Sequence, residues 1–263
     1  MNAARLSSAD NPLIKRTRRL VSHARDRREA ALVVLDGAHL LAAWSAAGRD
    51  LEYVLLGDKG ADDAEIVDLL ASFPRATIHR VSDRLLASVS PVETPTGVVA
   101  VAKQPFPAQA PDERADSVLL DGVQDPGNLG GILRTAAATG WRQVLLSPDC
   151  TQAWSPKALR AGMGAQLALQ IHEGVDLVAF LGGYQGLSLA ADVGAQESLF
   201  ALSHAPDLPL AWAFGAEGRG LRPAVLAAVG KRVGIPMSAA TESLNVGAAA
   251  ALCLYEGWRR RSR

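Results

Sequence analysis

The sequence is poor in cysteine and lacks a long apolar run. Its 263 residues include two cysteines, Cys150 and Cys253, and neither has a His or Cys at metal-ligand spacing. We therefore expect no metal site and no disulfide framework, which fits the reducing cytoplasm. No apolar stretch reaches the roughly 20 residues that cross a bilayer, and the first residues lack the apolar core of a signal peptide. We expect no membrane association.

The sequence also lacks a net charge, because 27 basic residues balance 27 acidic ones. The chain as a whole is therefore not an obvious binder of polyanions. The distribution is uneven, with basic clusters in the first 30 residues and at the C-terminus. Such clusters indicate either a footprint for nucleic acid or a solvated helix face and a frayed tail. The basic residues concerned are Arg5, Lys15, Arg16, Arg18, Arg19, Arg25, Arg27, Arg28, Arg259, Arg260, Arg261 and Arg263.

The first hundred residues alternate between helix and strand patterns. Asn11-Pro12 predicts the start of a basic helix that runs to about Ala30. Apolar runs predict strands at 31–36, 51–56, 76–81 and 96–102, with helices at 37–48, 62–73 and 82–89 between them. A segment rich in Pro and charge follows. We predict a small α/β domain over 1–105, a linker over 106–116 and a second domain over 117–263.

The second half alternates again and predicts a parallel α/β sheet. Such a sheet binds ligands beyond the carboxyl ends of its strands. Three loops that follow predicted strands have unusual compositions: "DGVQDPGNLGG", "FGAEGRGL" and "IPMSAATESLN". The predicted strands are 117–121, 143–147, 167–171, 187–191, 210–214 and 232–236, and the predicted helices are 128–139, 156–163, 175–182, 220–229 and 243–258.

The first loop combines glycines with an Asn and an Arg. Pro126-Gly127 predicts a tight turn, and glycines at a helix N-terminus form a natural anion site. The pattern is neither a dinucleotide fingerprint nor a Walker loop. Asn128 and Arg134 are separated by roughly 600° of helical rotation, so they serve different surfaces. A capping Asn and a solvated Arg would also explain them.

The other two loops join apolar strands to helices. In the second loop, three glycines flank Glu217, and their bare backbone would admit a flat or bulky ligand. Arg222-Pro223 then predicts a helix start. The third loop is dense in polar side chains, including Ser243 and Asn245, which could simply cap the Ala-rich helix that follows.

Together the three loops, in this order and spacing, resemble the three motifs of the SpoU/TrmH family of SPOUT-class RNA 2′-O-ribose methyltransferases. The stretch "SPKALRAGMGAQLAL" resembles the family's segment between its first two motifs. The first hundred residues resemble the family's small RNA-binding domain, through "NPLIKRTRRL", "LDGAHLL" and "VSPVETPTGVVAVAK". The resemblance covers nearly the whole chain.

The resemblance implies a trefoil knot, a homodimer whose active site uses both protomers, and S-adenosylmethionine (SAM) as cofactor. It implies that Gly215, Ile235 and Leu244 contact SAM. It implies catalytic positions at Arg134, Asn128, Glu217, Ser243 and Asn245, and no metal. The sequence departs from the family pattern in two respects: "PMSAA" has alanine, Ala239 and Ala240, where a glycine is usual, and Gly247 stands where serine is common. We expect a tighter cofactor loop.

The resemblance implies that Arg134 accepts the proton of the ribose hydroxyl. A guanidinium is normally protonated, so a clamp on the adjacent phosphate is an equally open role. Ribosomal RNA is the favoured substrate and transfer RNA the alternative. Two further readings are a non-catalytic RNA-binding protein of this fold and a nucleotide-dependent oxidoreductase. The oxidoreductase would need a G-x-G-x-x-G turn, which the sequence lacks.

Overall fold

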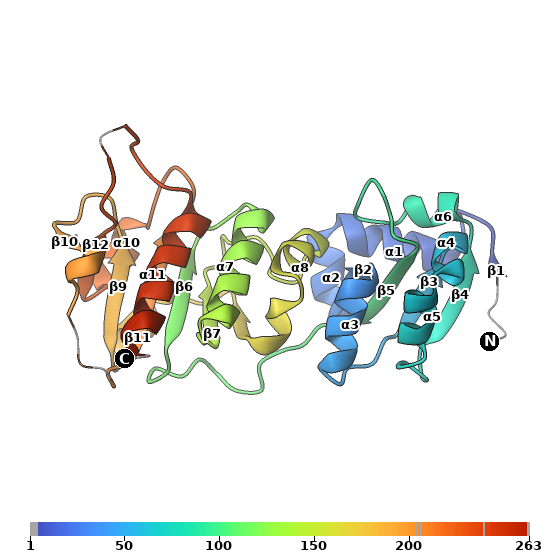
Figure 1. The fold of residues 1–263 in the computed structure, drawn as a ribbon, viewed down its shortest axis with the longest axis horizontal. Coiled ribbons are helices and arrows are strands. Elements are labelled where there is room, and N and C mark those ends of the chain that lie inside the picture. Colours follow the sequence, from blue (N-terminus) through green and yellow to red (C-terminus); the bar gives the residue numbers. More distant parts are fainter. Residues whose placement is uncertain (1–4, 204, 206, 239, 262–263) are drawn as a thin grey trace. The chain divides into compact units, whose positions relative to one another are not determined.

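A computed structural model describes residues 5–203, 205, 207–238 and 240–261. The chain forms two compact units (Figure 1). The first comprises residues 1–105 together with 154–167, and the second comprises 106–153 and 168–263. The N-terminal segment of the first unit ends at residue 105, where the sequence analysis places the end of its first domain. Residues 106–116 group with the second unit, and 154–167 group with the first although the sequence placed them in the second.

The first unit is built on a five-stranded mixed sheet in the order β1-β4-β3-β5-β2. Strand β5 runs antiparallel to β2 and β3, whereas β1, β4 and β3 pair in parallel. The elements are β1 Arg5–Leu6, α1 Pro12–Ser22, α2 Ala24–Ala30, β2 Leu32–Asp36, α3 Ala38–Ala46, β3 Tyr53–Leu56, α4 Asp58–Asp62, α5 Ala64–Leu70, β4 Thr77–Val81, α6 Asp83–Ala87, β5 Val98–Lys103 and α8 Pro156–Gly162.

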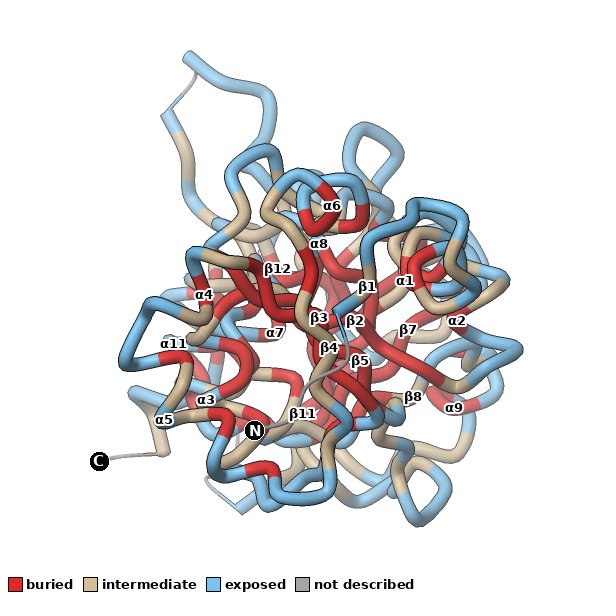
Figure 2. Tube along the Cα trace, turned by 90° about the vertical axis from the view of Figure 1, so that its right-hand side faces the viewer, coloured by how far each residue is buried: buried red, intermediate tan, exposed pale blue. Residues whose placement is uncertain are grey.

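Burial explains the strands of the first unit. Strands β2, β3 and β5 are buried along nearly their whole length (Figure 2). Their continuous Val, Leu and Ala runs are typical of strands that are covered on both faces. The sequence prediction of these strands is confirmed, while the two-residue strand β1 and the short helix α4 were not predicted.

The basic N-terminal helix is two helices. It begins as predicted, with the Asn11 side chain accepting a hydrogen bond from the Leu13 backbone N–H at 2.8 Å. The helix ends at Ser22 because His23 adopts extended backbone angles, and α2 then begins at Ala24. The Arg27 side chain is buried and donates to the Leu20 carbonyl at 2.7 Å. It thereby supplies a hydrogen-bond partner for one of the carbonyl groups at the end of α1, which have no partner within the helix.

Residues 154–167 carry helix α8 into the first unit. The helix begins at Pro156 after the cap Ser155, as the sequence predicted, and it packs against β2. Trp154, Ala158 and Leu159 are almost completely buried. The segment therefore contributes apolar core to a unit from which it is distant in sequence.

The second unit is built on a seven-stranded sheet in the order β10-β12-β9-β11-β6-β7-β8, and every pairing in it is parallel. The predicted parallel sheet is thus confirmed. Its elements are β6 Ser117–Asp121, α7 Pro126–Ala138, β7 Gln143–Leu146, β8 Gln170–Glu173, α9 Leu177–Gly183, β9 Leu187–Ala191, β10 Glu197–Ser198, η2 Leu199–Ala201, β11 Leu210–Gly215, α10 Pro223–Ala228, β12 Lys231–Gly234 and α11 Val246–Arg261. The 3₁₀ turn η1, Ala165–Ala168, begins in the first unit and ends with the first residue of the second segment of this unit.

Two elements of the second unit begin at other residues than the sequence predicted, and local hydrogen bonding explains both differences. The first loop does not turn at Pro126-Gly127; helix α7 begins at Pro126, because Asp125 accepts from the Asn128 backbone N–H at 2.8 Å and caps it. Strand β8 begins at residue 170 rather than 167, because the 3₁₀ turn η1 occupies 165–168. Within the described part of the chain, no helix is long and apolar enough to cross a membrane.

Candidate functional site

Three loops meet at the carboxyl edge of the parallel sheet. Strands β6 and β11 are neighbours, and their last residues, Asp121 and Gly215, are paired in register. The loops after them therefore leave the sheet side by side. The third loop leaves β12 and leads into α11. This arrangement brings together segments that are about a hundred residues apart.

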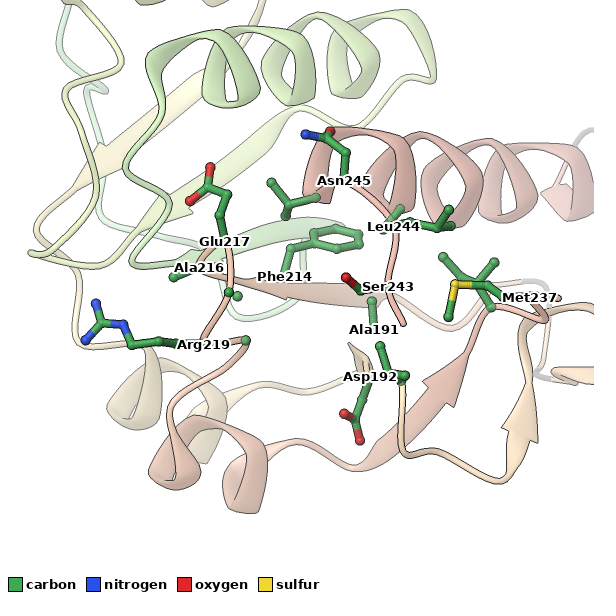
Figure 3. Close-up of a pocket in the computed structure, with 17 residues that line it drawn as sticks. Ala191, Asp192, Phe214, Ala216, Glu217, Arg219, Met237, Ser243, Leu244 and Asn245 are labelled. Atoms are coloured by element: carbon green, nitrogen blue, oxygen red, sulfur yellow. The ribbon is translucent and has the colours of Figure 1, made fainter. Parts of the chain in front are cut away.

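A pocket of about 520 Å³ opens between the second and third of these loops (Figure 3). Its wall is largely backbone and apolar side chain, and it also includes the end of β9. The lining residues are Ala191, Asp192, Val193, Phe214, Gly215, Ala216, Glu217, Gly218, Arg219, Gly220, Ile235, Met237, Ser243, Leu244, Asn245, Val246 and Ala249.

Most of the residues that the sequence singled out lie at this pocket. The expected cofactor contacts Gly215, Ile235 and Leu244 all line it, as do three of the expected catalytic residues, Glu217, Ser243 and Asn245. Asn128 does not line the pocket but is bonded to two residues that do. Ala239 lies outside the described residues, while Ala240 is exposed and does not line the pocket.

Side-chain hydrogen bonds join the three loops in series. The amide of Asn245 donates to the Asn128 side-chain oxygen at 2.9 Å, and the Asn128 amide donates to the Glu217 carboxylate at 2.8 Å. The oxygen of Asn245 accepts from the Gly247 backbone N–H at 2.9 Å and so caps α11. Each amide uses both of its ends, which fixes its orientation. The three loops cannot move independently without breaking a bond in this series.

Glu217 is held as a carboxylate. Partial burial alone would raise its pKa, but the bond from the Asn128 amide and those from backbone N–H groups, including that of Gln124, outweigh burial and lower the pKa. The Gln124 N–H lies 3.3 Å from the second Glu217 oxygen. Both oxygens therefore accept hydrogen bonds, which indicates an organising role rather than a proton-transfer role.

The glycine-rich loop is a tight hairpin. The Ala216 N–H donates to the Gly220 carbonyl at 3.1 Å, and the Gly220 N–H donates back at 2.9 Å. Gly218 and Gly220 have φ values of +82° and +68°, which other residues rarely adopt. At Gly215 a Cβ would overlap the backbone of Gly220 and Leu221. The hairpin requires these glycines, and they leave its backbone bare toward the pocket.

An ion pair between a buried carboxylate and a half-exposed guanidinium anchors the same hairpin, and sequence reasoning missed it. Asp121 is 1% exposed and ends β6, while Arg222 follows the hairpin. The Arg222 Nε donates to one Asp121 oxygen at 2.7 Å, and its backbone N–H donates to the other at 2.8 Å. No local sequence pattern marks two residues so far apart as partners.

Arg134 stands apart from the pocket. It lies on α7 beyond Asn128, its side chain is exposed, and it does not line the pocket. Among the described residues its guanidinium has no hydrogen-bond or ion-pair partner. Asn128 bonds to residues of the pocket wall and Arg134 does not, so that the two side chains lie apart; which partner each of them serves stays a prediction.

The basic residues 259–261 belong to the last helix, and their side chains form ion pairs. Arg259 and Arg260 both bind Glu256, with N–O distances of 2.7 Å, and Arg261 binds Asp116 and lies over the ring of Trp141. Helix α11 continues through Arg261, so the reading of this cluster as a frayed tail is wrong. Arg263 lies outside the described residues.

The parallel α/β sheet of the second unit and its solved structural neighbours show the fold of the SPOUT class of methyltransferases. The chain belongs to the SpoU rRNA methylase family, whose model matches residues 116–255, and residues 11–100 match an MRM3-like substrate-binding domain. An uncharacterized tRNA/rRNA methyltransferase of Synechocystis sp. is 33% identical over 98% of this chain and 94% of that protein.

Two further relatives agree with this assignment. The 23S rRNA (guanosine-2′-O-)-methyltransferase RlmB of Bordetella pertussis is 33% identical over 70% of this chain and 78% of its own. A crystal structure described as an RNA 2′-O ribose methyltransferase superposes with a TM-score of 0.82 at 29% identity, covering 98% of this chain and all of the other.

Proposed function

We propose that this protein transfers a methyl group from SAM to a ribose 2′-hydroxyl of RNA, with ribosomal RNA as the favoured substrate. The observation that carries the proposal is the series Asn245–Asn128–Glu217, which ties all three family motifs together at the rim of one pocket. The named activities of RlmB and of the superposed 2′-O ribose methyltransferase support the ribose hydroxyl as acceptor.

The pocket fits SAM. Its bare backbone at Gly218 and Gly220 leaves room and offers N–H and C=O groups to an adenine edge, and Phe214 and Met237 supply apolar surface. Ile235 and Leu244 would complete the contact from the third loop. When bound, SAM supplies an electrophilic, cationic methyl group, so the acceptor needs no metal for this displacement.

The ribose hydroxyl is a weak nucleophile and must lose its proton as it attacks. Ser243 and Asn245 both line the pocket, and their side chains would orient the ribose hydroxyl that accepts the methyl group. Glu217, with both oxygens engaged, would hold the second loop in place rather than move a proton. Arg134 would act as base or, more consistently with guanidinium chemistry, hold the adjacent phosphate.

A homodimer would explain the place of Arg134. A guanidinium that does not line its own pocket can serve the pocket of a second copy. One face of α11 also carries three large apolar side chains, Leu252, Tyr255 and Trp258, which are 42%, 49% and 48% exposed. Such a stripe is typical of a surface that a partner covers. We therefore propose a dimer in which α11 contributes to the interface.

Two elements of the family resemblance complete the proposal. A trefoil knot is supported by the meeting of the second and third loops at one pocket within an all-parallel sheet. The first unit would bind the RNA, which the match to a substrate-binding domain supports. Transfer RNA stays the alternative substrate, because the Synechocystis relative is described as a tRNA/rRNA methyltransferase.

The decisive experiment uses RNA from cells that lack this gene, separated into ribosomal and transfer fractions. Each fraction, and intact ribosomal subunits, would be incubated with labelled SAM and either the wild type or Arg134→Ala, and ribose methylation would be mapped. Label in ribosomal RNA that the mutant loses supports the proposal. Label confined to transfer RNA replaces the substrate. Intact SAM binding without label in any fraction favours a non-catalytic RNA-binding protein.

A further inference from the structure

Arg219 is presented rigidly at the mouth of the pocket. It lies within the hairpin 216–220, which is closed by two backbone hydrogen bonds between Ala216 and Gly220. The neighbouring Glu217 is fixed by Asn128 and by the Gln124 N–H. The backbone of Arg219 is therefore held from both sides, although its side chain is exposed.

Arg219 differs from the cations around it. Among the residues that line the pocket it is the only Lys or Arg, and within the described residues it has no hydrogen-bond or ion-pair partner. The neighbouring arginines at this edge of the sheet are engaged: Arg222 binds Asp121 and Arg232 binds Asp192. A rigid loop that presents an unpaired guanidinium beside a pocket favours an anionic partner from outside the protein.

We propose that Arg219 binds a backbone phosphate of the RNA next to the ribose that is methylated. The inference rests on the proposed function and adds a substrate-positioning residue to it. A planar guanidinium matches a phosphate with two parallel hydrogen bonds, so it would fix the register of the strand and not read its sequence.

The geometry favours an RNA phosphate over the carboxylate of the cofactor. Figure 3 shows the Arg219 side chain directed outward, away from Leu244 and Met237 of the pocket wall. The Glu217 carboxylate points in a different direction, toward α7. A guanidinium that is directed out of the pocket can reach the RNA strand as it approaches the site. The carboxylate of the bound cofactor would lie inside the pocket, where this guanidinium does not point.

The test compares Arg219→Ala with Arg142→Ala in the full-length protein. Arg142 precedes β7 and so lies at the opposite edge of the same sheet; its side chain is also exposed and unpaired among the described residues. Affinity for in vitro transcribed, unmodified large-subunit ribosomal RNA would be measured by filter binding at several salt concentrations. SAM affinity would be measured by calorimetry. Turnover would be measured with whichever RNA fraction, ribosomal or transfer, accepts label from the wild type.

We expect Arg219→Ala to weaken RNA binding by about tenfold and to lower the slope of log K against log salt by about one. SAM affinity should stay within about twofold, and KM for RNA should rise more than kcat falls. Arg219→Lys should keep the salt slope and recover only part of the affinity. Arg142→Ala should match the wild type.

Two results would overturn the inference. If Arg219→Ala and Arg142→Ala gave the same RNA affinity and salt slope, Arg219 would not touch a phosphate. If Arg219→Ala weakened SAM binding and left RNA binding unchanged, its partner would be the cofactor carboxylate. Neither result depends on turnover, so a wild type without methylation activity would refute the proposed function separately.

Discussion

The buried carboxylate of Asp121 is held at both of its oxygens by one residue, Arg222. The side chain of Arg222 is half exposed, whereas that of Asp121 is completely buried. The two partners are therefore unequal. Removing Arg222 leaves a buried charge with one bond, while neutralising Asp121 leaves a solvated guanidinium.

Arg222→Ala should consequently lower the stability of the fold more than Asp121→Asn does. We expect a loss of about 3 kcal/mol in the free energy of unfolding for the first and about 1 kcal/mol for the second. Urea denaturation followed by circular dichroism would measure both. Equal losses would show that the pair acts only as two hydrogen bonds. Both variants should also weaken SAM binding, because the pair anchors the glycine hairpin.

Gly215→Ala should distort the glycine hairpin that forms one wall of the cofactor pocket. The added methyl would overlap the backbone of Gly220 and Leu221, which cannot move without opening the hairpin. We expect SAM affinity, measured by calorimetry, to fall by at least about tenfold. Gly182→Ala is the matched control, because a Cβ there meets nothing within 4 Å. It should keep SAM affinity and stabilise α9 by about 0.5–1 kcal/mol.

Glu256 should make stability depend on acidic pH. Bonds from Arg259 and Arg260 lower its pKa from 4.5 to about 2, against the effect of burial. A carboxylate whose folded pKa is depressed contributes stability above its unfolded pKa and loses that contribution as pH falls through the folded value. Unfolding free energy should therefore decline between about pH 5 and pH 2. Glu256→Gln should flatten that decline; an unchanged slope would contradict the assignment.

The C-terminal arginines should support folding and not RNA binding. Arg260 spans from Glu256 to the carbonyls of Leu202 and Phe200, so Arg260→Ala should lower the unfolding free energy by about 2 kcal/mol. For this variant, the slope of log K for RNA binding against log salt concentration should equal that of the wild type. Arg16→Ala and Arg28→Ala are the contrast, since these exposed side chains have no partner among the described residues. Each should reduce the slope by about one.

The exposed stripe of α11 should control oligomeric state. Leu252→Lys places a charge in the proposed interface and should convert a dimer to a monomer, as measured by light scattering coupled to size exclusion. Val178→Lys adds the same charge at an exposed position of α9, 38% exposed, and should leave the dimer intact. A wild type that is already monomeric would refute the dimer directly.

The sequence predicted most elements and the position of the pocket, because both follow from local patterns. Apolar runs predicted β2, β3, β6 and β11, and Pro at the first helical position predicted the starts of α1 and α10. The break at His23 was not predictable, since the basic residues on both sides favour helix equally. It depends on Arg27 folding back onto carbonyls of α1.

Long-range pairings limited the prediction of the site. The sequence named Asn128, Glu217 and Asn245 separately, but their joining depends on the strand order β12-β9-β11-β6, which periodicity cannot predict. Asp121 and Arg222 were missed for the same reason. Each looks like an ordinary residue at the end of a strand or the start of a helix until the register brings them together.

The first unit is completed by a helix from the middle of the chain, and this changes how the two units can be separated. Deleting residues 1–105 would strip the buried side chains Trp154, Ala158 and Leu159 of their neighbours, so such a truncation confounds loss of RNA binding with exposure of a core. Cleavage within 106–116 would likewise leave α8 on the other fragment. Two polypeptides cut there would still share one folded unit, and would be expected to elute together.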